Sequence, residues 1–150
     1  MATITNQAAL SYNGVTTLSN IAVGELVEVL TATKTAADTT YTAGGVKTFV
    51  ISLVNSSAAA LTGLTVTDTL GSYTFSGNTL YPLTYVTGSL LYYVNGALQA
   101  TPTVTATAPL TVTGVTVPAG GSAMLIYTAR VNEYAPLGVD DSITNTATIT

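Results

Sequence analysis

Short runs in which apolar side chains alternate with threonine and other polar residues recur along this chain, separated by glycine, proline and asparagine. A period of two is typical of β-strands that bury one face, and no stretch sustains the period of an amphipathic helix. Asn95-Gly96 has the residues of a type I′ hairpin turn, in which both central residues take positive φ. Pro118 to Gly121 marks another turn between two apolar runs. The sequence therefore predicts an all-β protein.

The predicted strands are Thr3 to Tyr12, Leu26 to Lys34, Lys47 to Asn55, Gly63 to Asp68, Leu83 to Val86, Ser89 to Val94, Ala97 to Ala100, Leu110 to Val117, Ala123 to Val131 and Ser142 to Thr150. Many short strands with turns between them favour an immunoglobulin-like antiparallel β-sandwich, although the usual cysteine and tryptophan landmarks are absent. Residues 25–150 are predicted to form this domain. Residues 1–24 are predicted to be an N-terminal extension, either an extended strand or, because of Asn13-Gly14, a hairpin.

The charge and residue composition excludes several classes of function. Charged residues are 7% of the chain, against roughly 25% in typical soluble proteins, and the net charge is -4. Copies with so few charges repel one another weakly, and the negative sign disfavours nucleic acid and anionic membranes as partners. Without cysteine or histidine, disulfides, thiolate and Ser-His-Asp catalysis and imidazole ligands are excluded. We expect a non-enzymatic protein that needs no cofactor or metal and whose partners are proteins or carbohydrates.

Targeting signals are not evident in the sequence. No basic and apolar leader follows Met1, and no apolar run reaches the roughly 18 residues of a membrane span, so neither a signal peptide nor membrane insertion is predicted. If the chain nevertheless acts outside the cell, two explanations stay open. The chain is released by lysis of a mother cell, or it is a fragment from which a leader and flanking parts are missing.

Residues 4–10, ITNQAAL, resemble residues 143–149, ITNTATI. The side chains that share one side are Ile4, Asn6, Ala8 and Leu10 in the first copy, and Ile143, Asn145, Ala147 and Ile149 in the second. One fold rarely needs two copies of its closing strand. The first copy is therefore predicted to complete or extend a sheet in a neighbouring subunit, where it adds backbone hydrogen bonds and places alternate side chains in pockets. Such a chain would polymerise with itself.

Several phrases between Leu30 and Thr150 resemble, in the same order, a known repeat domain: Ala32 to Ala36, Tyr41 to Gly45, Phe49 to Asn55, Leu64 to Leu70, Val117 to Gly121 and Ile143 to Ala147. They are similar to the conserved repeat domain of unknown function from bacterial and archaeal surface proteins. The resemblance implies an immunoglobulin-like fold, tandem repeats on cell envelopes, and a structural or adhesive role without an enzyme site. Here the first Ile-Thr-Asn phrase begins at Ile4, so either strand exchange replaces the covalent tandem linkage or the phrase is a remnant of an upstream repeat.

Alternation places Lys34, Asp68 and Asn145 on the inward sides of their strands. An early-strand lysine, a mid-chain acid and a last-strand asparagine are similar to the residues of surface sandwiches that form an intramolecular isopeptide bond. Burial favours the uncharged forms of an amine and a carboxyl group. The resemblance thus implies that neutral Lys34 attacks the carboxamide of Asn145 while protonated Asp68 polarises its carbonyl. The product is an amide crosslink made without cysteine.

Each of these residues also has a simpler structural explanation. Asp68 can cap a turn, Asn145 can bond the backbone at a strand end, and Lys34 can extend to solvent. Lys47 and Asn55 form a weaker rival pair, because they lie on the same strand and cannot readily meet.

Two further groups of side chains are candidates for binding. Glu133, Asp140 and Asp141 lie near one predicted loop end and can bind Ca²⁺, but a solvated turn is favoured because no calcium-loop pattern accompanies them. Tyr92 and Tyr93 are adjacent, so they face opposite sides of a strand. We expect one of them to be exposed at an interface with protein or sugar.

These features predict a self-assembling structural subunit of an extracellular or spore-surface fibre, which polymerises by β-strand donation. The alternative is an adhesive or carbohydrate-binding module from a longer tandem-repeat protein of the cell surface. A fibre subunit assembles when purified. A binding module stays monomeric and depends on its tyrosine surface.

Overall fold

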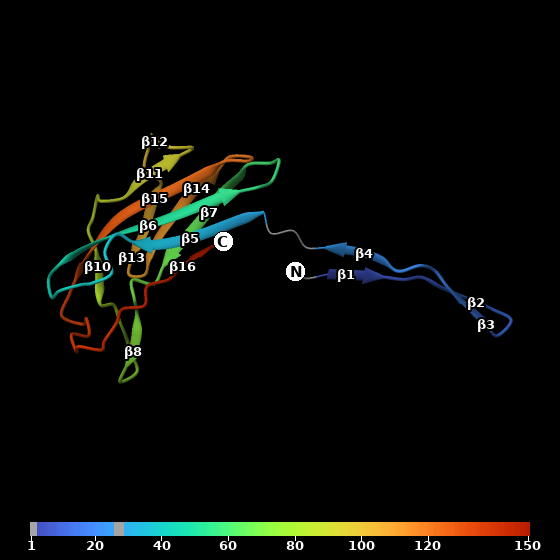
Figure 1. Cartoon of the computed structure of the whole chain (residues 1–150), viewed down its shortest axis with the longest axis horizontal. Helices are drawn as coiled ribbons and strands as arrows, with labels where there is room; N and C mark the ends of the chain where they lie inside the picture. Colours follow the sequence, from blue (N-terminus) through green and yellow to red (C-terminus); the bar gives the residue numbers. More distant parts are fainter. Residues whose placement is uncertain (1–2, 26–28) are drawn as a thin grey trace.

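The body of the protein is a sandwich of two antiparallel sheets (Figure 1). The computed structural model describes residues 3–25 and 29–150. The larger sheet has the order β12-β11-β15-β6-β5, with β10 also paired to β15, and its strands are β5 (Leu30–Ala36), β6 (Val46–Asn55), β10 (Leu83–Tyr85), β11 (Leu91–Val94), β12 (Ala97–Gln99) and β15 (Ser122–Val131). The smaller sheet has the order β13-β14-β7-β16, and its strands are β7 (Leu61–Asp68), β13 (Thr103–Thr107), β14 (Leu110–Val117) and β16 (Ala147–Ile149). The predicted all-β, immunoglobulin-like sandwich is confirmed.

The core lies between the two sheets and follows the predicted alternation. Every second residue of β6 and of β15 is buried. The buried side chains of the larger sheet include Phe49, Ile51, Leu53, Leu125 and Tyr127, and those of the smaller sheet include Val66, Leu110, Val112, Val115 and Val117. Because a slip of one residue would turn each strand inside out, this burial fixes the register of both central strands.

The predicted and observed strands differ in several places. The short hairpin of β8 (Tyr73–Phe75) and β9 (Asn78–Leu80) and the strand β13 were not predicted, because their segments are short and largely exposed. The predicted strand from Ser142 forms a ladder only over Ala147–Ile149. Part of another predicted strand, residues 26–28, lies outside the described residues. In the part of the chain that is described, no helix is long and apolar enough to cross a membrane.

Residues 3–25 form a hairpin, which we call the arm. Its strands are β1 (Thr3–Asn6), β2 (Ala9–Tyr12), β3 (Val15–Leu18) and β4 (Ala22–Glu25), with β1 paired to β4 and β2 paired to β3. The tip is Asn13-Gly14, and both residues take positive φ, as a type I′ turn requires. Of the two forms expected for the extension, the arm has the hairpin form. Figure 1 shows it extending away from the body, and all side chains from residue 3 to residue 24 are exposed.

Candidate crosslinking site

Four polar side chains from different elements meet inside the sandwich, and we call them the polar cluster. They are Lys34 on β5, Asp68 at the end of β7, Tyr127 on β15 and Asn145 just before β16. Asp68 and Tyr127 are each 1% exposed, and the side chain of Lys34 is 12% exposed. The cluster therefore joins the edge strand of the larger sheet to the segment that leads into the edge strand of the smaller sheet.

Asp68 is the centre of this cluster. Its Oδ2 atom accepts hydrogen bonds from the Lys34 ammonium group at 2.5 Å and from the Tyr127 hydroxyl group at 2.6 Å. Its Oδ1 atom accepts from the backbone N–H of Leu70 at 3.0 Å. Asp68 thus caps the turn that follows β7, as the simpler explanation expects, and at the same time pairs with the buried lysine.

Asn145 is held by both ends of its carboxamide group. Its Oδ1 atom accepts hydrogen bonds from the backbone N–H of Gly71 at 3.1 Å and from the hydroxyl group of Thr69 at 3.3 Å. Its Nδ2 group donates to the hydroxyl oxygen of Tyr127 at 3.2 Å. Two donors on the carbonyl oxygen are the arrangement that stabilises negative charge when a nucleophile attacks a carbonyl carbon.

Burial changes the acid–base properties of two members of the cluster. It lowers the pKa of Lys34 from its ordinary value, although the neighbouring Asp68 carboxylate acts in the opposite direction. It raises the pKa of Tyr127, and the charge and hydrogen bond of Asp68 raise it further, while the hydrogen bond from Asn145 lowers it. The lysine amine is thus more readily neutral than in water, and the tyrosine hydroxyl keeps its proton.

Aromatic rings enclose the lysine side of the cluster. The ring of Phe49 stacks on that of Tyr127 with centroids 5.4 Å apart, and the amine nitrogen of Lys34 lies 5.1 Å from the Phe49 ring centroid. An ammonium group over a ring face is attracted to its quadrupole. The stack therefore holds both the amine and the hydroxyl group in place.

The tight approach of Asn145 to the turn after β7 requires a glycine. Gly71 has φ of +71°, and a Cβ atom there would lie 2.4 Å from Cγ2 of Ile143. Positive φ and the absence of a side chain let residues 143–145 pass over the turn. Asn145 can then reach the Gly71 N–H.

The rival pair does not meet. Lys47 and Asn55 lie at opposite ends of β6. Lys47 donates to the backbone oxygen of Thr40 and lies 3.3 Å from a carboxylate oxygen of Asp38. The buried amide of Asn55 instead donates to the carbonyl groups of Ala59, Val117 and Pro118. These contacts organise loops and bring no lysine to an asparagine.

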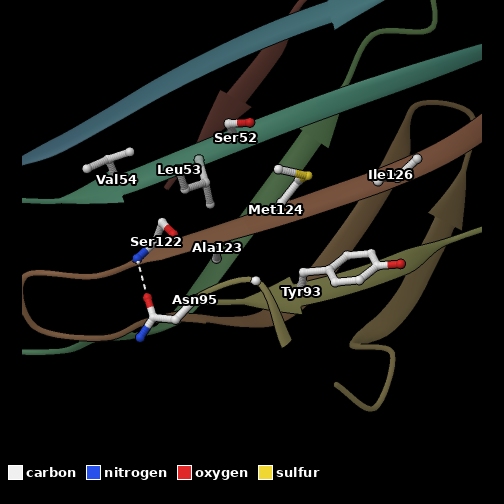
Figure 2. A pocket seen from close by; sticks show the side chains of 10 residues that line it. Ser52, Leu53, Val54, Tyr93, Asn95, Ser122, Ala123, Met124 and Ile126 are labelled. Atoms are coloured by element: carbon white, nitrogen blue, oxygen red, sulfur yellow. Dashed lines mark hydrogen bonds between the residues drawn. The ribbon is translucent and has the colours of Figure 1, made fainter. Parts of the chain in front are cut away.

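The two adjacent tyrosines lie on opposite faces of β11. Tyr92 is 6% exposed and its hydroxyl group donates to the backbone oxygen of Thr116 at 2.6 Å, so it belongs to the core. Figure 2 shows Tyr93 beside Met124 and near Ile126, in a shallow hollow on the outer face of the larger sheet. Among the described residues, those that line this hollow are all uncharged. Tyr93 is the member of the pair that remains available for contacts.

The three loop carboxylates do not form a metal centre in the described part of the chain, where no group of three His, Cys, Asp or Glu side chains is placed to hold an ion. Asp141 accepts a hydrogen bond from the backbone N–H of Gly138 at 2.7 Å. This contact organises a turn, the simpler of the two expectations for these acids.

Two parts of the site were not foreseen from the sequence. Tyr127 was missed, although Ala123, Leu125 and Ala129 share its side of the strand and predict that it points inward. A buried tyrosine hydroxyl group needs a partner, so this parity was an available signal. No sequence pattern indicated that the Gly71 N–H and the Thr69 hydroxyl group would bond Asn145, because these contacts depend on the path of residues 142–146.

Comparison with known proteins finds similarity in structure alone. No family model and no curated protein matches the sequence. A structure of the pilus backbone RrgB from Streptococcus pneumoniae is 17% identical, with a TM-score of 0.55 over 73% of this chain and 25% of that chain. The full-length RrgB pilus protein structure is 13% identical, with a TM-score of 0.62 over 96% of this chain and 28% of the other. At these identities the likeness shows the fold, and the resemblance to the surface repeat domain stays a prediction.

Proposed function

We propose that this protein is a self-assembling structural subunit of an extracellular fibre at a cell or spore surface, in which the arm of one subunit binds the body of the next. The observation that carries the proposal is the surface of the arm. Its large apolar side chains are between 56% and 76% exposed: Ile4, Leu10, Tyr12, Val15, Leu18, Ile21 and Val23. Residues 3–24 contain no charged side chain. An extensive apolar surface of this kind marks an interaction site.

The backbone of the arm supports the same role. A two-stranded hairpin has an unpaired edge on each strand, and natural proteins usually guard such edges with lysine, proline or charge. The arm has none of these over residues 3–24. An isolated hairpin is also marginally stable in water. Docking against a sheet of another subunit would supply ladder hydrogen bonds and bury apolar side chains.

The donor residues expected from the sequence all lie in this arm. Ile4 and Asn6 are on β1, Leu10 is on β2, and Ala8 lies between these strands, where its N–H donates to the hydroxyl oxygen of Ser19 at 3.0 Å. Since these residues already pair within a hairpin, the donated element is the whole hairpin. Its donating surface differs from any accepting surface on the body, so the contact is heterologous and propagates into a fibre.

An amide between Lys34 and Asn145 is the second part of the proposal. The Lys34 amine, made more readily neutral by burial, attacks Cγ of Asn145 while the Oδ1 atom is stabilised by its two donors. The Nζ–Cγ bond forms, the Cγ–Nδ2 bond breaks, and ammonia leaves. The contacts through Asp68 and Tyr127 support this assignment.

The crosslink suits a subunit that bears tension. It would join β5, the first strand of the body, to the segment before β16, the last strand. Force entering near Lys34 and leaving near Asn145 would pass through covalent bonds, so the intervening residues would not be extended. Unfolding of the body would then be slow under load, which is the form of stability that a fibre needs.

Deletion of the arm tests the proposed assembly. Full-length protein is expected to form fibres visible by electron microscopy and large species in sedimentation. A variant lacking residues 1–25 is expected to be folded and monomeric, because residues 3–24 contribute no buried side chain to the body. Circular dichroism of the variant checks the fold.

Two results would contradict the assembly proposal. The truncated variant polymerises like the full-length protein, or the full-length protein stays monomeric at high concentration. A monomeric full-length protein would favour the alternative of a binding module, and Tyr93→Ala combined with a glycan-binding screen would then test the tyrosine on the outer face of its larger sheet. A measured intact mass equal to that of the unmodified sequence, with no ammonia lost, would reject the crosslink independently of assembly.

A further inference from the structure

The hydroxyl group of Tyr127 lies between the acid and the nitrogen that must leave. It is 2.6 Å from Oδ2 of Asp68 and 3.2 Å from Nδ2 of Asn145. The same Asp68 oxygen is 2.5 Å from Nζ of Lys34. These contacts form a continuous path from the attacking amine to the leaving nitrogen.

Loss of ammonia requires a proton at that nitrogen. A carboxamide nitrogen leaves poorly as an anion, so a positioned acid must protonate it in the transition state. Asp68 and Tyr127 are each 1% exposed, which leaves little access for water. A side chain inside the cluster is therefore better placed than water to supply the proton.

We propose that Tyr127 is a catalytic residue for the amide bond, transferring a proton from Asp68 to Nδ2 of Asn145. This inference rests on the proposed Lys34–Asn145 crosslink and adds a residue to it. No other hydroxyl group of the described chain is hydrogen-bonded to both Asp68 and Asn145.

The proposed steps conserve every atom and charge. The Lys34 ammonium group first passes a proton to Asp68 along their 2.5 Å hydrogen bond, which leaves a neutral amine and a carboxylic acid. Nζ of Lys34 bonds to Cγ of Asn145, whose oxygen takes a negative charge and whose Nδ2 becomes tetrahedral with a lone pair. Tyr127 gives its hydroxyl proton to Nδ2 and takes the proton of Asp68, and Asp68 then removes a proton from Nζ. The Cγ–Nδ2 bond breaks, ammonia leaves, and the carbonyl group forms again.

The surroundings of Tyr127 suit a relay. In the resting state Nδ2 donates to the hydroxyl oxygen, and the hydroxyl group donates to Asp68. Once Nδ2 has a lone pair and Asp68 carries a proton, the Tyr127 hydroxyl group can donate to Nδ2 and accept from Asp68. The two hydrogen bonds then run in the opposite direction, and the side chains need not move far. Because its pKa is raised, Tyr127 stays a neutral phenol and passes a proton on without becoming a free base.

The test compares Tyr127→Phe with Tyr92→Phe in the full-length chain. Each variant loses one buried hydroxyl group that makes a 2.6 Å hydrogen bond, but only Tyr127 contacts the polar cluster. Freshly synthesised protein is sampled over time by intact mass, and the loss of one ammonia measures bond formation. We expect the wild type and Tyr92→Phe to react alike and Tyr127→Phe to react about 100-fold more slowly or worse.

The pH profile separates a relay from a structural role. The wild-type rate is expected to stay flat with pH, because the proton that leaves the Lys34 amine stays within the cluster and reaches the leaving nitrogen. The Tyr127→Phe rate is expected to fall as pH rises, because its proton must then come from solvent, which supplies fewer protons. A Tyr127→Phe rate equal to that of the wild type overturns the relay. The relay is also overturned if Tyr127→Phe and Tyr92→Phe are slowed equally and both keep the pH dependence of the wild type. A wild type that never loses ammonia overturns the crosslink and the relay together, while fibre assembly is scored separately by microscopy.

Discussion

The hydroxyl group of Tyr127 on β15 donates a hydrogen bond to Asp68 at the end of β7, at 2.6 Å, and so links the two sheets through the core. Among the described residues, no buried side-chain nitrogen or oxygen atom lacks a hydrogen-bond partner. The polar cluster is therefore fully satisfied, and the removal of one member leaves others buried and unpaired.

Replacement of Asp68 is expected to weaken the fold and to prevent the crosslink. Asp68→Ala leaves the Lys34 amine and the Tyr127 hydroxyl group without their acceptor. Breaking a buried ion pair from one side costs about 3–5 kcal/mol. Denaturant unfolding should show a loss of this size relative to Asn145→Ala, which also lacks the crosslink, and intact mass should show no ammonia lost.

Asp68→Asn is the matched control for that experiment. Asparagine has nearly the same shape, and its single carbonyl oxygen can still accept from either Tyr127 or Leu70, but it cannot carry protons at neutral pH. We expect a smaller loss of stability than for Asp68→Ala and an equal failure to form the amide. A crosslink that forms normally in Asp68→Asn would show that the acid has no chemical role.

The stability of a variant that cannot crosslink should depend on pH. In Asn145→Ala, burial still lowers the pKa of Lys34, so between that value and 10.5 the unfolded chain holds a proton that the folded chain lacks. The free energy of unfolding then rises with pH, by at most about 1.4 kcal/mol per pH unit. Above about pH 10 it falls again, because Tyr127 keeps its proton only when folded.

The control for this pH dependence is the same variant with Lys34→Met. Methionine has no proton to lose, so the rise with pH should disappear. The measurement is urea unfolding in a series of alkaline buffers. A rise that persists without Lys34 would assign the titration to another group.

Gly71 is expected to resist substitution because of both its backbone and its neighbour. An alanine at this φ of +71° is strained, and its Cβ atom would lie 2.4 Å from Ile143. Gly71→Ala should lose about 1–3 kcal/mol of stability and slow amide formation by displacing Asn145. Gly77→Ala is the control, since it has φ of +79° and no atom within 4 Å of its Cβ position. If both substitutions have equal effects in thermal unfolding and intact mass, the close packing of Gly71 against Ile143 does not contribute.

Much of the fold follows from the alternation of side chains in the sequence. The parity of Leu64 and Val66 predicts that Asp68 points inward, and it is among the most buried residues of the protein. The parity of Ile143 and Ala147 likewise predicts that Asn145 points inward, and all three are half-buried. Period-two burial is a local property of a strand, so the sequence is sufficient to predict it.

Other features depend on contacts that the sequence does not encode locally. Residues 142–146 have the alternation of a strand, but the Thr146 carbonyl group accepts from Thr69 and Asn145 bonds the following turn. In the arm, residues 3–12 alternate without a break, yet β1 and β2 are separate strands because each pairs with a different partner. In both segments the tertiary path of the chain, and not the local pattern, determines which residues form a ladder.

A single charge on the arm is expected to block assembly and leave the body folded. Leu10 is 72% exposed, so Leu10→Asp costs the free subunit little. In a fibre the carboxylate would be buried without a partner, at a cost of several kcal/mol. Thr105→Asp, on an exposed position of β13, is the control. Sedimentation should find Leu10→Asp monomeric and the control assembled, and normal assembly of Leu10→Asp would exclude this part of the arm from the contact.

The most direct test of fibre growth by arm donation is to mix full-length protein with the variant lacking residues 1–25 and to measure fibre lengths by electron microscopy. A subunit without an arm can accept an arm from its neighbour but cannot donate one, so it ends the fibre that it joins. The account predicts that mean fibre length falls steadily as the fraction of armless subunit rises. Lengths that do not change with that fraction, or fibres made of armless subunits alone, would contradict it.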